Sequence, residues 1–168
     1  MKTKSRKKIK VFVGTKRKTA KNLLKCYSED WRNFPKNSDL RKKLLEIYKQ
    51  KYEGKTIVNS KTGITILFEL YGAKKTTKHG SMYAEKASLI TILDKICEHA
   101  FLHSLGAQKK GDKENGVVGY LNFRAPVIVD DKQKLVEIPV RIKNNGNFHY
   151  CIDIPLTYKQ ANRQLKKC

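Results

Sequence analysis

The alternation of apolar and polar residues in the last third of the chain constrains the fold more than any other feature. Three segments place apolar side chains at every second position: YLNFRAPVIVD, LVEIPVRIK and FHYCIDI. DDKQ and NNGN separate them, and such polar runs are typical of tight turns. Successive side chains of a strand point to opposite faces. The pattern therefore predicts a three-stranded antiparallel meander with one buried face and one open face.

The segment NSDLRKKLLEIYKQKYEG predicts a helix ahead of this meander. Asn37 or Ser38 is a suitable capping residue, and Leu40, Leu44 and Tyr48 follow at helical spacing. Two β-type runs, 56–59 and 64–71, then flank NSKTG, which is favourable hairpin chemistry.

A further helical pattern runs from about residue 83 to residue 103. Leu89, Leu93, Ile96 and Ala100 lie on one face of it. The order of elements predicts an α+β fold, with N-terminal helices, a β-hairpin and a long helix packed on the C-terminal three-stranded antiparallel meander.

Three regions are predicted along the chain. Residues 1–54 form a basic arm and a helical extension, with a short strand at 9–13 and a basic helix around 20–27. Residues 55–154 form the α+β domain, and residues 155–168 form a basic tail.

The charge of the chain predicts an anionic partner. Thirty-seven Lys and Arg residues oppose fifteen Asp and Glu residues, which gives a formal net charge of +22. RNA is the foremost candidate, and solubility alone is the alternative explanation. No apolar run is long enough to span a bilayer and no signal-peptide pattern is present, so no membrane partner is predicted. The four cysteines lie far apart without a CxxC pair, which favours free thiols in a cytoplasmic protein.

The predicted open face of the meander gathers cations and a histidine. The alternation assigns to it Asn122, Arg124, Glu137, Arg141, Lys143, His149 and Asp153. These residues suit phosphate binding, although Arg124 can instead pair with Glu137 across the sheet.

KKTTKHGS, residues 74–81, is predicted to be a phosphate-handling loop at the rim of this face. It contains three lysines, three hydroxyl side chains and His79. RNA cleavage without a metal needs groups that remove and donate a proton, with cations around the phosphate. His79 is the foremost catalytic candidate and His149 the next, while a solvated histidine is the alternative for each. The predicted phosphate contacts are Lys74, Lys75, Thr77, Lys78, Ser81, Arg124, Arg141 and Lys143.

A metal site is not predicted, and neither is a cofactor. CEHAFLH places His99 and His103 on one face of the predicted helix, but it is not HExxH and no third ligand follows at a telling spacing. Packing at the helix end is the preferred explanation.

In order, TIVNSKTGITILF, GAKKTTKHG, a helix, YLNFRAPVIVDD and VEIPVRIKNNGNFHYCIDI resemble a small domain of phage and mobile-element polyvalent proteins. That domain is assigned to the barnase, EndoU, colicin and RelE-like nuclease superfamily. The resemblance covers about residues 55–154 and implies a metal-independent RNase fold used in toxins. The matching active positions are Lys75, Thr77, His79, Ser81 and Tyr150. The strand alternation instead directs His149, and not Tyr150, to the open face.

Two functions follow as hypotheses, with a DNA-binding accessory factor as a third. The first is an endoribonuclease that acts as a toxin or phage effector and cleaves RNA by attack of the 2′-hydroxyl. The alternative is a non-catalytic binder of RNA or protein, such as an inhibitor of host defence. The further partner would be a cognate antitoxin or a host-defence protein.

Overall fold

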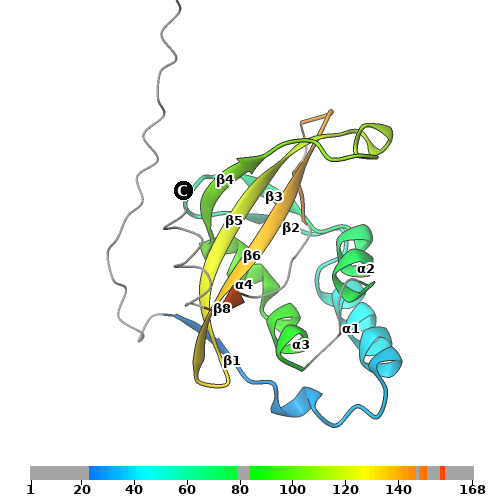
Figure 1. The fold of residues 1–168 in the computed structure, drawn as a ribbon, viewed down its shortest axis with the longest axis vertical. Helices are drawn as coiled ribbons and strands as arrows, with labels where there is room; N and C mark the ends of the chain where they lie inside the picture. The colour runs from blue at the N-terminus through cyan, green and yellow to red at the C-terminus, as the bar shows by residue number, and fades with distance from the viewer. Residues whose placement is uncertain (1–22, 79–83, 147, 151–155, 158–168) are drawn as a thin grey trace, which may run out of the picture.

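The computed structural model describes residues 23–78, 84–146, 148–150 and 156–157, and in these ranges the chain forms a sheet with helices packed against it (Figure 1). The described residues contribute eight strands to the sheet, and the path through six of them is β1-β5-β6-β7-β3-β2. The predicted α+β class is confirmed.

Two long strands, β5 (Val117–Val129) and β6 (Lys132–Lys143), form the centre of the sheet. They pair antiparallel and are joined by Asp130 and Asp131, whose φ angles are 48° and 59°. Both values lie in the left-handed region, which aspartate tolerates and which two-residue hairpins require. The third strand, β7 (Phe148–Tyr150), pairs antiparallel with β6. The predicted meander is therefore confirmed as far as Tyr150, while the rest of its third strand, with Asp153, lies outside the described residues.

Shorter strands extend the sheet on both sides of this meander. The predicted hairpin is present as β2 (Thr56–Val58) and β3 (Thr65–Leu67), and β3 joins β7 in parallel. On the other side, β4 (Phe101–Gly106) and β1 (Leu24–Cys26) both pair with β5. β8 (Leu156–Thr157) pairs with β6.

Within the described ranges, four α-helices accompany the sheet: α1 (Asn37–Lys51), α2 (Leu70–Lys78), α3 (Ala84–Thr91) and α4 (Leu93–His99). Short 3-10 helices occupy Glu29–Trp31 and Lys113–Asn115. The helix predicted from Asn37 is confirmed, with Leu40, Leu44 and Tyr48 buried. Gly54, at a φ of 75°, allows the chain to turn from α1 into β2.

The core lies between α3, α4 and one face of the sheet. Leu89, Leu93 and Ile96 of these helices are fully buried in one cluster with apolar residues of β5 and β6. The strand residues in this cluster are those that the alternation predicts, namely Leu121, Phe123, Ala125, Val127, Val129, Val136, Ile138 and Val140. The prediction of the buried face is confirmed.

The helix predicted from residue 83 to residue 103 is interrupted and ends early. Ile92 separates α3 from α4 with φ −119° and ψ 22°, and its N–H bonds to the carbonyl of Leu89 only three residues back. Thr91 contributes to the break, because its hydroxyl donates to the carbonyl of Ser88 and competes with the helix. Residues 101–103 belong to β4, because the unpaired edge of β5 accepts them as a strand.

Two other local predictions are wrong in the described residues. The basic helix expected around residues 20–27 is contradicted at Leu24–Cys26, which form β1 in parallel with Val127–Val129. The second strand of the hairpin was expected to reach residue 71, but it ends at Leu67 and α2 begins at Leu70. The strand predicted at 9–13 lies outside the described residues.

Buried polar side chains tie distant elements together. The amide nitrogen of Asn59, fully buried, donates to the carbonyls of Cys97 and Ala100 at 2.7 and 2.8 Å. Its oxygen accepts hydrogen bonds from the backbone N–H groups of Lys61 and Thr62. Asn59 thus joins the hairpin turn to the end of α4.

Candidate nucleic-acid interface

The face of β5 and β6 that lies opposite the core carries two almost completely buried arginines. Arg124 is 7% exposed and Arg141 is 4% exposed. The strand register pairs Arg124 with Glu137 and Arg141 with Tyr120. We call this surface the arginine face, and define it by His103, Ser104, Asn122, Arg124, Glu137 and Arg141. The sequence pattern assigns the β5 and β6 residues to the correct face, but the prediction that this face is open is wrong for both arginines.

Arg124 is held by a carboxylate. Its Nε and Nη2 atoms donate to Oε1 of Glu137 at 2.9 and 2.5 Å. The cross-strand pair considered from the sequence is therefore present. The remaining nitrogen, Nη1, is buried and has no hydrogen-bond partner among the described residues.

Arg141 is covered by the start of α2. Its Cζ atom lies 4.0 Å from the ring centroid of Tyr71, which is a cation–π contact. Its Nη2 atom is 3.5 Å from Oε2 of Glu69, an ion pair without hydrogen-bond geometry. Among the residues that the structure describes, neither Nε nor Nη2 of Arg141 makes a hydrogen bond.

These unpaired donors indicate a place for an anion. A buried donor without a partner costs about 1–3 kcal/mol, and more for a charged group. The Nε and Nη2 atoms form one edge of the guanidinium, which is the edge that binds carboxylate or phosphate with two parallel bonds. In Arg124 this edge is used by Glu137, whereas in Arg141 the same edge is buried, makes no hydrogen bond within the described residues and has only the Glu69 carboxylate nearby, at 3.5 Å.

A bulge in β4 brings a histidine to the same face. Leu102 pairs with Phe123 and Ser104 pairs with Asn122, so His103 is the extra residue between them. Asn122 donates to the hydroxyl of Ser104 at 3.2 Å. Burial lowers the pKa of His103 below its ordinary value of 6.5, and the charge of Arg124 lowers it further, while Glu137 acts in the opposite direction. His103 is therefore neutral at pH 7 and able to accept a proton.

The predicted phosphate loop is a helix over the part that the structure describes. Residues 74–78 continue α2, since lysine favours helices, and the Thr77 hydroxyl donates to the carbonyl of Ala73 at 2.9 Å. Thr77 is buried, so the expectation that it lies on an exposed loop is wrong. Lys74 is exposed. Lys75 and Lys78 are helical, but their side chains lie outside the described residues, as do His79 and Ser81 entirely.

The remaining predicted residues lie on the central strands. Lys143 is half-buried and donates from Nζ to the carbonyl of Asn115 at 2.6 Å. The register places His149 of β7 opposite Arg141 and Tyr150 opposite Val140. This register agrees with the alternation, which assigns His149 to the polar face. The side chains of both β7 residues lie outside the described part.

Three residues near the site were not selected from the sequence. Tyr71 and Glu69 belonged to a predicted strand, and His103 to a predicted helix. FLHSLG also has a strand-like pattern, because the larger side chains of His103 and Leu105 alternate with the smaller Ser104 and Gly106. That pattern could have placed His103 on a strand, but nothing local to it shows that the strand borders Arg124.

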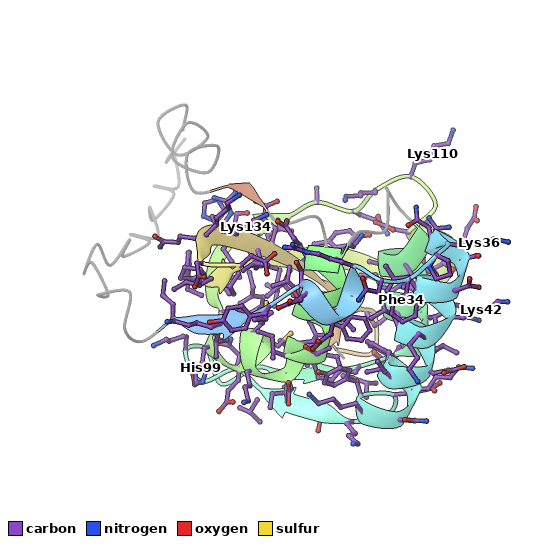
Figure 2. All side chains as sticks on the ribbon, turned by 90° about the horizontal axis from the view of Figure 1, so that it is seen from below. Phe34, Lys36, Lys42, His99, Lys110 and Lys134 are labelled. Carbon is purple, nitrogen blue, oxygen red and sulfur yellow. The ribbon has the colours of Figure 1, made fainter. Side chains whose placement is uncertain are left out.

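Basic side chains also surround the fold away from the arginine face. Figure 2 shows Lys42 and Lys110 projecting from the ribbon, and both are exposed. Lys134 is different, because it forms an ion pair with Glu85. The exposed lysines provide a general attraction for a polyanion, whereas the arginine face has specific geometry.

A protein-family model matches the part of the chain that forms the arginine face. Residues 35–150 match the model of large polyvalent protein-associated domain 3. The chain belongs to this family. The matched region begins just before α1 and ends at the last residue of β7, so it contains the arginine face. No curated protein and no solved structure matches the chain significantly.

The resemblance to a domain of polyvalent proteins is thus confirmed. The family match begins earlier than the span of about 55–154 recognised from the sequence, so that it includes α1, and it ends at residue 150. The assignment to the nuclease superfamily stays a prediction. Within the described ranges, no helix has both the length and the apolar character that crossing a bilayer requires.

Proposed function

We propose that this polyvalent-protein domain binds RNA on the arginine face and cleaves it without a metal, as an effector of a mobile element in the cytoplasm. The observation that carries the proposal is the pair of buried arginines whose free nitrogens make no hydrogen bond within the described residues, beside His103, whose pKa is lowered by burial and by Arg124. A net charge of +22 supports a polyanionic partner. The earlier resemblance to metal-independent RNases agrees with this choice of chemistry.

The two arginines are far enough apart along the strands to serve different phosphates. Tyr120, the partner of Arg141, precedes Arg124 by four residues on β5. This corresponds to about 13 Å along the strand. We assign cleavage to the end with His103 and Arg124, and binding of a neighbouring phosphate to Arg141.

The reaction needs one proton acceptor and one proton donor. Neutral His103 takes the proton of the 2′-hydroxyl, and the 2′ oxygen forms a bond to phosphorus while the bond to the 5′ oxygen breaks. Nη1 of Arg124 stabilises the charge on the phosphate oxygens. The predicted histidines His79 and His149 are candidates for the proton that the departing 5′ oxygen receives. The products are a 2′,3′-cyclic phosphate and a 5′-hydroxyl.

Incubation of the purified chain with single-stranded RNA in EDTA tests this function. We expect 2′,3′-cyclic ends, and no cleavage of the DNA of the same sequence, which lacks the 2′-hydroxyl. His103→Asn should reduce cleavage by about 10²- to 10⁴-fold with little change in RNA affinity. Lys42→Gln is the control for a lost surface charge, because Lys42 is exposed on α1.

Other outcomes would change the assignment. If the wild-type chain binds RNA but leaves it intact, the non-catalytic alternative holds. If His103→Asn cleaves as fast as the wild type, the base is one of the other predicted histidines. Absence of RNA binding at low salt would overturn RNA cleavage and non-catalytic RNA binding, and would leave the protein-binding alternative.

A further inference from the structure

Tyr71 has an unusual position for a half-exposed aromatic residue. It is 48% exposed, although one side of its ring lies against the guanidinium of Arg141 at 4.0 Å. A tyrosine that served only to fill space would bury more of its ring. Here the ring forms part of the surface directly over the arginine with the unpaired edge.

The backbone beside Tyr71 is anchored to α1, and one side of its ring contacts Arg141. Tyr71 lies in the first turn of α2. Two residues earlier, the backbone carbonyl of Glu69 accepts a hydrogen bond from the Tyr48 hydroxyl of α1 at 3.0 Å. The guanidinium of Arg141 restricts the ring from below. A preordered aromatic ring loses little conformational entropy when a ligand stacks on it.

Hydrogen-bond donors for a phosphate beside an exposed aromatic ring are typical of sites that bind single-stranded nucleic acid. Proteins that bind single-stranded nucleic acid combine cations along the backbone with aromatic side chains on which unpaired bases stack. Arg141 supplies an edge that matches one phosphate, and exposed Lys74, one helical turn after Tyr71, continues the positive charge along α2.

We propose that Tyr71 stacks on an unpaired base next to the phosphate bound by Arg141, so that the domain selects single-stranded RNA. This rests on the proposed function, because it assumes that RNA occupies the arginine face. In a duplex the bases are already stacked on their neighbours, and a ring at the surface cannot reach them. A structural role, in which Tyr71 only covers Arg141, is the alternative that the experiment must separate.

The experiment uses two labelled strands of equal length and charge that cannot be cleaved. One is a short 2′-O-methyl oligoadenylate, and the other carries abasic units in place of the bases. The wild-type chain should bind the oligoadenylate about 5- to 100-fold more tightly than the abasic strand at the same low salt. The oligoadenylate annealed to its complement should also bind less tightly than the single strand.

Tyr71→Leu should remove the preference for bases while keeping the affinity for the abasic strand. Tyr71→Phe should keep the preference, because the phenyl ring stacks equally well. The matched control is Tyr27→Leu. Tyr27 is 56% exposed and follows β1, which pairs with the far end of β5 from Arg141. Thermal melting establishes that each variant is folded.

Three results would overturn the inference. If Tyr71→Leu weakens binding to both strands equally, the ring only covers Arg141. If the wild-type chain binds duplex and single strand alike, no base is selected. If the wild-type chain binds no strand at low salt, the proposed function fails, and the stacking role fails with it.

Discussion

Arg124 donates two hydrogen bonds to a single oxygen of Glu137, from Nε at 2.9 Å and from Nη2 at 2.5 Å. Arg141, on the neighbouring strand, makes no hydrogen bond with the same edge among the described residues, although its Nη2 forms an ion pair with Glu69 at 3.5 Å. The two arginines of one face therefore differ in whether their guanidinium edge is hydrogen-bonded. Arg124 is compensated within the fold and influences His103, whereas Arg141 retains an edge that an anion can complete.

The first prediction concerns the pKa of His103, which is set by burial, Arg124 and Glu137. Arg124→Gln removes a positive charge, so the pKa of His103 should rise. Glu137→Gln removes a negative charge, so the pKa should fall further. NMR titration of the histidine ring protons measures both shifts. The resonances of His99 are the internal control, because its charged neighbour is Glu98 at 3.9 Å. Shifts of equal sign in the two variants would contradict this electrostatic account.

The sign of the pH dependence follows from the lowered pKa of His103. Between its pKa in the folded chain and 6.5, the unfolded chain binds more protons than the folded chain. The contribution of His103 to stability is therefore undiminished above pH 6.5 and decreases as the pH falls through the folded pKa. Cleavage should decrease in the same direction, since the base becomes protonated.

The second prediction contrasts the two arginines in stability and binding. Arg141→Met removes a buried charge with unpaired donors, so the free energy of unfolding should stay constant or increase. The same change should weaken RNA binding and make the slope of log affinity against log salt less steep by about 1. Arg124→Met should instead destabilise the fold by about 1–3 kcal/mol, because it leaves Glu137 without its partner. Chemical denaturation and binding at several salt concentrations measure these effects.

A reversed pattern would show that Arg141 is needed for folding and not for a ligand. If Arg141→Met destabilises the chain while Arg124→Met does not, the unpaired edge of Arg141 has no functional meaning. A comparable loss in both variants would show that the two arginines have the same structural role.

The sequence predicts the faces of β5 and β6 well, because a period of two is a local property of the strand. It places Arg124 and Glu137 on one face, and the register then makes them direct partners. It does not predict that this face is covered. Tyr71 reaches Arg141 from 70 residues away along the chain, and its contact depends on how α2 packs.

The local sequence around β4 and β1 fits more than one structure. Phe101–Gly106 continues an apolar pattern that also suits a helix, and β5 provides the strand edge that decides the outcome. Leu24–Cys26 becomes a strand through parallel pairing with residues about a hundred positions later. Such pairings are decided by tertiary contacts, so His103 could not be placed beside Arg124 from its own neighbourhood.

The third prediction concerns the polar contacts of Asp130 with Ser28 and Arg32, which join the segment after β1 to the β5–β6 turn and are here called the clamp. Asp130 accepts hydrogen bonds from the side-chain hydroxyl and the backbone N–H of Ser28, and it forms an ion pair with Arg32 at 3.0 Å. The hydrogen bonds to the Ser28 hydroxyl and N–H, with Arg32 in addition, lower the pKa of Asp130 below its ordinary value of 3.8. The clamp therefore stabilises the fold above pH 3.8 and is lost as the pH falls through the folded pKa.

Asp130→Asn should lower the free energy of unfolding at pH 7 by about 1–2 kcal/mol, and the difference from the wild type should shrink at acid pH. Asp131→Asn is the matched control. Asp131 has a similar φ of 59° in the same turn, and asparagine tolerates this conformation at least as well as aspartate. Urea denaturation at several pH values measures both. Equal losses in the two variants would show that only the turn, and not the clamp, is affected.

The fourth prediction concerns Asn59, whose amide joins the hairpin turn to the end of α4. Asn59→Ala removes the donors to the carbonyls of Cys97 and Ala100, which lie in the buried core cluster. It also removes the acceptor for the N–H groups of the turn. Because several buried polar groups lose their partners together, the free energy of unfolding should fall by about 2–4 kcal/mol.

The control is Ser60→Ala, whose hydroxyl donates to the carbonyl of Glu98 in an exposed position. It should cost less than about 1 kcal/mol. Hydrogen exchange should show faster opening of α4 in Asn59→Ala alone. If both variants unfold at the same denaturant concentration as the wild type, Asn59 does not couple the hairpin to α4.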